Sequence, residues 1–189
     1  MVLLFIVMEY FKNIILKNGK TCIIRNGREE DGKAVLDNFI LSHGETDNML
    51  SYPDEIDRTA AQESEFLREK QLSPNEVMIV AEVEGRIVGV SGIDCVGTKY
   101  KMRHRAVFGI HVEKAFWGLG IGRAMTQACI ECAVRAGYSQ LELDVVSDNR
   151  SACNLYRSEG FTEFGRNPRG FKSRSGAWQE LVLMRKVLD

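Results

Sequence analysis

Apolar residues recur along this chain with two spacings, one typical of strands and one typical of helices. Residues 77–83 and 86–92 are rich in Val and Ile and are separated only by Glu84-Gly85, which predicts a β-hairpin. Residues 29–41 carry apolar side chains at helical spacing and predict a helix. The same criteria predict further strands at 21–25, 103–112, 141–146, 161–164 and 178–187, and further helices at 60–71, 120–136 and 149–158.

This succession of strands and helices predicts an α/β domain with a mixed sheet flanked by helices. A chain of 189 residues is long enough to bury a sizeable core. Only three prolines occur, and no repeat, low-complexity tract or linker divides the chain. We therefore expect a single domain over 20–189, preceded by a short N-terminal extension over 1–19.

The charges nearly cancel, with 25 Lys and Arg against 26 Asp and Glu. No global field therefore favours nucleic acid or an anionic membrane, and small molecules or proteins are the expected partners. Five cysteines in strand or helix segments indicate a reduced, cytoplasmic protein. The apolar residues 1–8 are far shorter than the ~20 residues of a membrane span and have no basic leader, and Met8 is an alternative start to Met1.

The most informative segment is 110–125, where a predicted strand runs through a glycine-rich turn directly into a helix. Gly118, Gly120 and Gly122 let backbone N–H groups approach an anion closely. The unpaired N–H groups and the positive dipole end of the following helix favour a phosphate. We therefore expect a pyrophosphate site at this turn, with tight packing of the turn as the alternative.

Two other phosphate-binding turns fit the spacing less well. A P-loop requires Gly-Lys-Ser/Thr, whereas Gly122 is followed by Arg123. A dinucleotide fingerprint requires a third glycine where this chain has Met125, although Glu142 or Asp144 is placed to imitate its ribose-binding acid. A dinucleotide-binding protein therefore stays an alternative.

The turn resembles the acyl-CoA turn of the GNAT superfamily of N-acetyltransferases, which reads Gln/Arg-x-x-Gly-x-Gly/Ala after a strand ending near a valine. This chain has Trp117-Gly-Leu-Gly-Ile-Gly122 after Val112, and Trp in place of Gln or Arg removes one polar contact to the phosphates. Residues 141–161 resemble the second family signature, a strand, an Asn and a helix reading Ala-x-x-Leu-Tyr-x-x-x-Gly-Phe. The resemblance covers residues 103–165, while 20–100 agree only in element order.

The resemblance implies a mostly antiparallel sheet of about seven strands, with acetyl-CoA as cosubstrate. Two strands splay apart in this family, and the pantetheine arm lies in the gap beside the backbone of Ile110 and Val112. Tyr156 is implied to protonate the departing CoA thiolate, with packing on the sheet as its alternative role. Asn149 either fixes the pantetheine or caps its helix. The residues implied to bind the cofactor are Ile110, Val112, Trp117, Gly118, Leu119, Gly120, Ile121, Gly122, Arg123, Asn149, Asn154 and Tyr156.

An amine attacks a thioester only as the free base, so some group must take a proton from the ammonium form. The resemblance places His104 where some family members carry a glutamate base, and His111 nearer to the thioester. Glu82, on a strand beside the expected cleft, is a third candidate. Each is equally explained as a structural or exposed residue. A backbone N–H of Ile110 or Val112 is expected to stabilise the oxyanion.

The Cys129-x-x-Cys132 pair lies on the apolar side of a predicted helix with no completing ligand, so we expect core packing and no metal. The basic runs at 99–105 and 166–174 are expected to be solvated. The acceptor pocket is expected to form from 46–52 and the last hairpin.

The expected function is transfer of an acetyl group from acetyl-CoA to a primary amine of a small molecule or protein, by direct attack on the thioester. A module that binds acyl-CoA without turnover is the alternative from another class. No feature of the sequence identifies the amine. Many family members are dimers, so a homodimer is an open alternative to a monomer.

Overall fold

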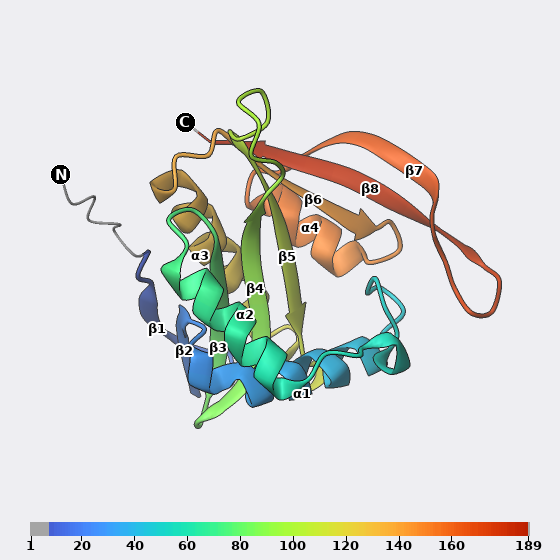
Figure 1. The fold of residues 1–189 in the computed structure, drawn as a ribbon. Coiled ribbons are helices and arrows are strands. Elements are labelled where there is room, and N and C mark those ends of the chain that lie inside the picture. Colours follow the sequence, from blue (N-terminus) through green and yellow to red (C-terminus); the bar gives the residue numbers. More distant parts are fainter. Residues whose placement is uncertain (1–7, 189) are drawn as a thin grey trace.

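The computed structural model describes residues 8–188 and contains an eight-stranded sheet with helices on both faces (Figure 1). The strands are β1 (Phe11–Ile15), β2 (Thr21–Asn26), β3 (Val77–Val83), β4 (Arg86–Cys95), β5 (Arg105–Val112), β6 (Gln140–Val146), β7 (Thr162–Lys172) and β8 (Trp178–Val187). The helices are α1 (Gly32–Gly44), α2 (Ala60–Leu72), α3 (Ile121–Arg135) and α4 (Arg150–Ser158). Short 3-10 turns are η1 (Glu29–Asp31), η2 (Pro53–Glu55) and η3 (Lys114–Phe116).

The sheet order is β1-β2-β3-β4-β5-β6-β8-β7, and every neighbouring pair is antiparallel except β5 and β6. The predicted mixed, mostly antiparallel sheet flanked by helices is therefore confirmed, with eight strands in place of about seven. The predicted hairpin between β3 and β4 is also confirmed. Its turn residues Glu84 and Gly85 have φ of +52° and +77°, the conformation that a two-residue turn between twisted strands requires.

The N-terminal strand β1 was not expected from the sequence. It pairs with β2 from Phe11 to Ile15, and Tyr10 and Leu16 at its two ends are buried in the core. The sequence pattern concealed it because Phe11 and Ile15 are exposed on this edge strand, so its apolar residues do not mark an inward face. The expected extension over 1–19 therefore overlaps the sheet, and its residues 1–7 lie outside the described part.

Strand β7 is longer than the predicted 161–164. It continues past Pro168, which is tolerated because β7 is an edge strand and needs no N–H donor on its outer side. The register against β8 shifts between Asn167 and Phe171, which is the signature of a bulge beside the proline. The result is a long β7–β8 hairpin that extends from the body of the molecule (Figure 1).

The core lies on both faces of the sheet. Helices α1 and α2 cover one face, and α3 and α4 lie on the other (Figure 1). Cys129 and Cys132 of α3 are fully buried free thiols, as the packing interpretation predicted. Among residues 8–188, no helix is long and apolar enough to cross a membrane.

The parallel pair β5–β6 is the one irregular junction that matters for the site. The two strands pair only from Arg105 to Val107 and from Gln140 to Glu142. Beyond these residues each strand continues, to Val112 and Val146, without pairing to the other. The centre of the sheet is therefore open on one side of this short ladder.

Candidate active site

Six consecutive backbone N–H groups, those of residues 118–123, have no hydrogen-bond partner within the described part of the chain; regular bonding resumes where Ala124 N–H donates to the Gly120 carbonyl at 3.1 Å. Gly118 and Gly120 have φ of +74° and +104°, which favour glycine. A Cβ at either position would meet no protein atom within 4 Å. The turn thus presents free donors and the positive end of α3 to open space, the arrangement that binds a phosphate.

Trp117 and Arg123, at the two ends of this turn, direct their side chains to protein groups. The Trp117 indole Nε1–H donates to the Val112 carbonyl at 2.6 Å and so ties the turn back to the end of β5. The Arg123 guanidinium pairs with Glu159 and donates to Ser158 Oγ at 3.0 Å. The resemblance implies a phosphate contact from Gln or Arg at this position, whereas the Trp117 side chain makes a contact within the protein.

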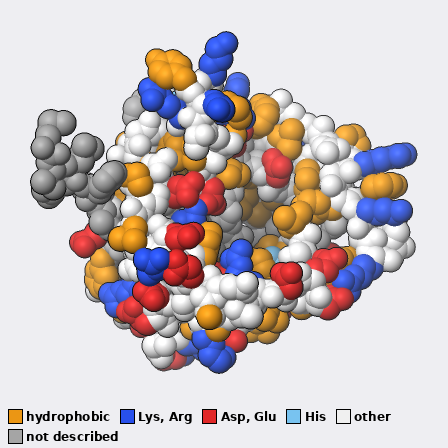
Figure 2. Space-filling view, in the orientation of Figure 1, with side chains coloured by type: hydrophobic (Ala, Val, Ile, Leu, Met, Phe, Trp, Pro, Cys, Tyr) orange, Lys and Arg blue, Asp and Glu red, His pale blue; other side chains and the backbone are white. Residues whose placement is uncertain are grey.

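A cavity of about 690 Å³ lies on the gap between β5 and β6. Residues 107–111 of β5 and 143–146 of β6 line it, together with side chains of α1, α2, the loop 48–58 and the hairpin. Figure 2 shows the hollow on the face that α1 and α2 cover in part. The structure thus brings a concave site to the point where the two central strands separate.

Tyr156 of α4 lines this cavity from the opposite face of the sheet. Its ring packs edge-on against Phe108 with centroids 6.1 Å apart and lies 5.9 Å from the Phe161 ring. Burial raises the pKa of the Tyr156 phenol, so the hydroxyl stays protonated and remains a proton donor at neutral pH. The residue is therefore both packed on the sheet and present at the gap.

Asn149 and Asn154 occupy different surroundings on α4. Asn149 is the N-cap: its Oδ1 accepts from Ala152 N–H at 3.2 Å, and the residue also lines the cavity. Asn154 is exposed and is not among the residues that line the cavity. The Asn149 side chain thus caps the helix. Its contact with pantetheine, the other role that the resemblance implies, stays a prediction.

Two histidines meet in the cavity. His111 of β5 has its Nδ1 3.0 Å from Ser42 Oγ, and its ring centroid lies 5.6 Å from that of His43. His43 stacks on Phe39 with centroids 3.8 Å apart, and its Nδ1 lies 2.8 Å from the Phe39 carbonyl. Burial lowers the pKa of His111 to about 3, with the charge of His43 acting in the same direction. Burial also lowers the pKa of His43, against the opposing effect of its backbone hydrogen bond, so both rings are neutral near pH 7.

His43 was missed by the sequence analysis. A lone histidine near the end of a helix carries no motif, and its proximity to His111 depends on how α1 packs on β5. The available signal was only local: Phe39 precedes His43 by one helical turn, so the two rings share a helix face.

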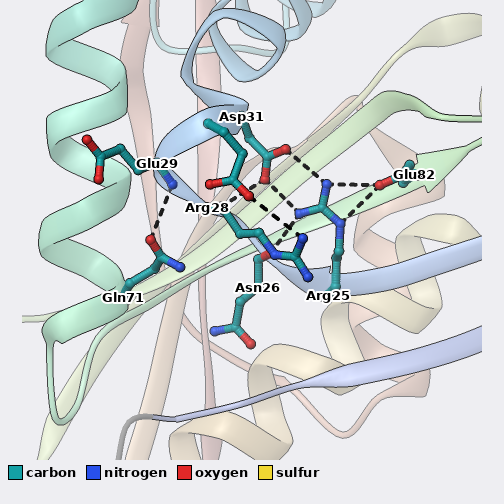
Figure 3. A network of polar contacts seen from close by, with 8 residues as sticks. Arg25, Asn26, Arg28, Glu29, Asp31, Gln71 and Glu82 are labelled. Carbon is teal, nitrogen blue, oxygen red and sulfur yellow. Dashed lines mark hydrogen bonds and ion pairs between the residues drawn. The ribbon is translucent and has the colours of Figure 1, made fainter.

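Glu82 does not contribute to the cavity, and its proposed role as base is withdrawn. Figure 3 shows the Arg25 guanidinium between Glu82 and Asp31, with nitrogen–oxygen distances of 2.9 Å and 2.6 Å. Glu82 is therefore held by a half-buried ion pair at the β2–β3 junction. Neither Glu82 nor Arg25 lines the cavity.

His104 is also misplaced by the sequence analysis. It is exposed in the turn before β5, and its carbonyl accepts from Ser139 N–H at 2.9 Å. This is the end where β5 and β6 still pair, whereas the cavity opens toward the other end of β5. Strand direction thus separates His104 from the site and brings His111 into it.

The segment 46–58 reaches across the cavity to the hairpin. Arg174 N–H donates to the Tyr52 hydroxyl at 3.0 Å, and its guanidinium lies 2.7 Å from Asp54. Gln179 donates to the Asp47 carbonyl at 2.9 Å. The two regions expected to form the acceptor pocket therefore meet, and both contribute to the cavity wall.

Carboxylates outnumber cations in the cavity wall. Arg58 is the one Lys or Arg among the described lining residues, and it pairs with Glu63 at 2.7 Å. The lining carboxylates are Glu55, Asp57, Glu63, Asp94 and Asp144. Lys70 and Arg174, which lie outside the lining, pair with Asp94 and Glu55. Asp57 and Asp144 have no ion pair among the described residues, and these two carboxylates favour a cationic ligand, such as an ammonium group, over an anionic one. Within residues 8–188, no group of three His, Cys, Asp or Glu side chains is arranged to hold a metal ion.

Comparison with known proteins places this geometry in a family. Residues 43–161, more than half of the chain, match the acetyltransferase (GNAT) family. The chain therefore belongs to the GNAT family of acetyltransferases.

Met125 stands where a dinucleotide-binding turn would require its third glycine. Its side chain is buried in α3, where it packs beside Gly89.

Individual relatives agree with this assignment. A GNAT-family acetyltransferase from Streptococcus pneumoniae superimposes with a TM-score of 0.84 at 27% identity, over 88% of this chain and 99% of that one. A putative acetyltransferase from Salmonella typhimurium, solved with its cofactor acetyl-CoA, has the same fold, with a TM-score of 0.78 at 22% identity over 88% and 93% of the two chains. The N-alpha-acetyltransferase RimI of Mycobacterium tuberculosis is 35% identical over 100 residues, 53% of this chain and 61% of that protein. The chain spans less than two thirds of the length of three curated relatives that it matches.

Proposed function

We propose that this protein transfers an acetyl group from acetyl-CoA to a primary amine of a small molecule or protein. The observation that carries the proposal is the row of six free N–H groups at residues 118–123, beside a gap in the sheet that opens into a cavity. The donors fit a pyrophosphate, and the absence of a Cβ at Gly118 and Gly120 would let the pyrophosphate come close to the backbone. Acetyl-CoA is the cosubstrate that supplies the activated acyl group.

The residues around the gap fit direct transfer. The unpaired side of β5 at Ile110 would hold the pantetheine arm as an extra strand, and its backbone N–H would face the thioester oxygen. Tyr156 would donate its proton to the departing thiolate, because the raised pKa of its phenol keeps it protonated near pH 7. The acidic cavity wall would attract the acceptor in its ammonium form, which supports an amine as the acceptor.

We further propose that the protein works in a reducing compartment such as the cytoplasm. All five cysteines are free thiols, and four of them are buried in strands or helices. Burial raises the pKa of Cys129 to about 12 and of Cys132 to about 11, so these thiols are unreactive.

Calorimetric titration with acetyl-CoA, CoA and NAD tests the proposal. Micromolar binding of acetyl-CoA and CoA without NAD binding is expected, followed by release of free thiol when acetyl-CoA is incubated with an amine panel. Absence of CoA affinity, or preference for NAD, would overturn the assignment. Binding without thiol release from any amine would favour a non-catalytic acyl-CoA module.

A further inference from the structure

We propose that His43 takes the proton from the acceptor amine, through its Nε2 atom. This inference rests on the proposed transferase function and assigns the missing base of that reaction. It starts from the placement of His43 in the wall of the cavity, on α1, across from the edge of β5.

The hydrogen bond to Phe39 decides which nitrogen of His43 is free. A backbone carbonyl can only accept, so the Nδ1 atom 2.8 Å from the Phe39 carbonyl must carry the hydrogen. In the neutral ring the Nε2 atom then carries the lone pair. Stacking on the Phe39 ring fixes the plane of the imidazole, so His43 is an oriented base rather than a mobile side chain.

His111 lacks this fixed tautomer. Its Nδ1 faces the Ser42 hydroxyl, which either donates or accepts, and the single hydroxyl hydrogen of Ser42 has the Phe39 carbonyl, 3.1 Å away, as a second acceptor. Burial also lowers the pKa of His111 to about 3, so a proton placed on it is held weakly. His111 is therefore a neutral wall of the site, and its ring packs edge-on against Phe39.

Charged groups from several other elements share the cavity wall with His43. From the other elements the cavity wall contributes Glu63 of α2, Asp94 of β4, Asp144 of β6, and Glu55 and Asp57 of the loop, against Arg58 and the neutral His111. Three of these carboxylates are paired with cations: Glu63 with Arg58, Asp94 with Lys70 and Glu55 with Arg174. Burial lowers the pKa of His43, so the ring is neutral before the reaction and readily gives up the proton that it takes.

The ammonium acceptor gives one proton to Nε2 of His43, and the nitrogen lone pair so freed forms the C–N bond to the thioester carbonyl carbon. The C–S bond breaks, and its electron pair leaves with sulfur as the thiolate. Sulfur takes the proton of Tyr156, the nitrogen loses its second proton, and that proton restores the phenol. His43 returns its proton to water.

Two substitutions at His43 separate proton transfer from packing. His43→Gln keeps an N–H for the Phe39 carbonyl, and His43→Phe keeps the stacking on Phe39. With acetyl-CoA and a panel of putrescine, benzylamine, glycine and glycinamide, both variants are expected to lose about 10²-fold or more in kcat, with the KM for acetyl-CoA within about threefold. The matched control is His104→Gln, the same change at the histidine outside the cavity, which should retain full activity.

The acid limb of the pH profile and imidazole rescue distinguish a base from a structural residue. The wild-type kcat/KM should fall at low pH as His43 is protonated, and this limb should vanish in His43→Gln. In His43→Gly, added imidazole should raise the rate of the variant at least about tenfold. A wild-type rate and profile in His43→Gln would overturn the inference, whereas failure of the wild type to bind acetyl-CoA or release thiol would overturn the proposed function itself.

A measurement on the wild type keeps the inference falsifiable when the variants do not fold. Long-range proton–nitrogen NMR of the histidine rings should show His43 in the Nδ1–H form near pH 7. The Nε2–H form would place the lone pair on the wrong atom and overturn the proposal.

Discussion

At the scale of single residues, Tyr156 is buried in the core and also lines the cavity at the gap, so removal of its hydroxyl tests the acid step. Tyr156→Phe keeps the ring against Phe108 and removes the hydroxyl. We expect kcat to fall by about 10²-fold while the Kd for acetyl-CoA stays within about threefold, because the lost proton donor acts only when the thiolate leaves. Thiol-release kinetics and calorimetry measure the two quantities.

The control for Tyr156 is Tyr138→Phe, a second buried tyrosine that accepts from Asn75 Nδ2 at 2.8 Å. It lies outside the cavity and should retain kcat while losing about 1 kcal/mol of stability. Equal kcat for wild type and Tyr156→Phe would show that the phenol is packing alone.

At the scale of elements, the turn at the start of α3 requires glycine for its backbone conformation and is proposed to bind a phosphate. Gly120→Ala forces φ of +104° on a residue with a Cβ, and that Cβ would enter the open space proposed for the phosphate. We expect at least tenfold weaker acetyl-CoA binding, together with a loss of about 1–2 kcal/mol of stability. Calorimetry and chemical unfolding give the two values.

Gly137 is the matched control for this prediction. It follows the other end of α3 with φ of +80°, and a Cβ there also meets no atom within 4 Å. Gly137→Ala should lose a similar stability and leave acetyl-CoA binding unchanged. Equal Kd values for the two variants would remove the phosphate site from this turn.

The junction of β2, β3 and η1 depends on the ion pairs of Arg25 with Asp31 and Glu82 (Figure 3). Arg25→Met leaves Glu82 and Asp31 without their ion-pair partner, although Asp31 keeps the hydrogen bond from the Arg28 N–H, and should cost about 2–4 kcal/mol in unfolding free energy. Burial raises the pKa of Asp31, but the hydrogen bonds from Arg25 and Arg28 outweigh burial and leave it below its ordinary value.

The sign of the pH dependence follows from that lowered pKa. The stabilisation is present above the unfolded pKa of about 3.9 and is lost as pH falls through the folded value. Urea unfolding should therefore show a larger difference between wild type and Arg25→Met at pH 7 than at pH 3. Lys33→Met, which breaks the exposed Lys33–Asp37 pair, should cost less than about 0.5 kcal/mol. An equal cost of Arg25→Met at both pH values would contradict the assignment.

At the scale of the whole molecule, the segment 46–58 closes the cavity through its contacts with the hairpin. Arg174→Ala removes the pair with Asp54 and the stacking over Tyr52, which are exposed and contribute little to stability. We expect faster hydrogen exchange in 46–58, a several-fold higher KM for the amine, and an unchanged KM for acetyl-CoA. Unaltered exchange in 46–58 would show that other contacts hold this segment.

Much of the fold was predictable from short-range pattern. The β3–β4 hairpin follows from two Val- and Ile-rich runs joined by Glu84-Gly85, and the glycine turn before α3 follows from Gly118, Gly120 and Gly122. Strand β1 was not predictable, because an edge strand with exposed Phe11 and Ile15 has no inward-facing pattern. The length of β7 was concealed by Pro168, which only an edge position tolerates.

The sequence by itself determined the features that depend on neighbouring residues. These are the free N–H groups of the glycine turn, the cap at Asn149, and the position of Tyr156 on the helix that this cap begins. Tertiary structure alone decided which distant side chains meet. Ser42 and His111 are 69 residues apart and touch because α1 packs on β5. Glu82 pairs with Arg25 at the β2–β3 junction, outside the cavity, and His104 lies at the end of β5 away from the gap. Local backbone geometry is encoded within a few residues, whereas the proximity of side chains depends on the packing of whole elements, so the partners of the site's ionisable groups emerged only from the fold.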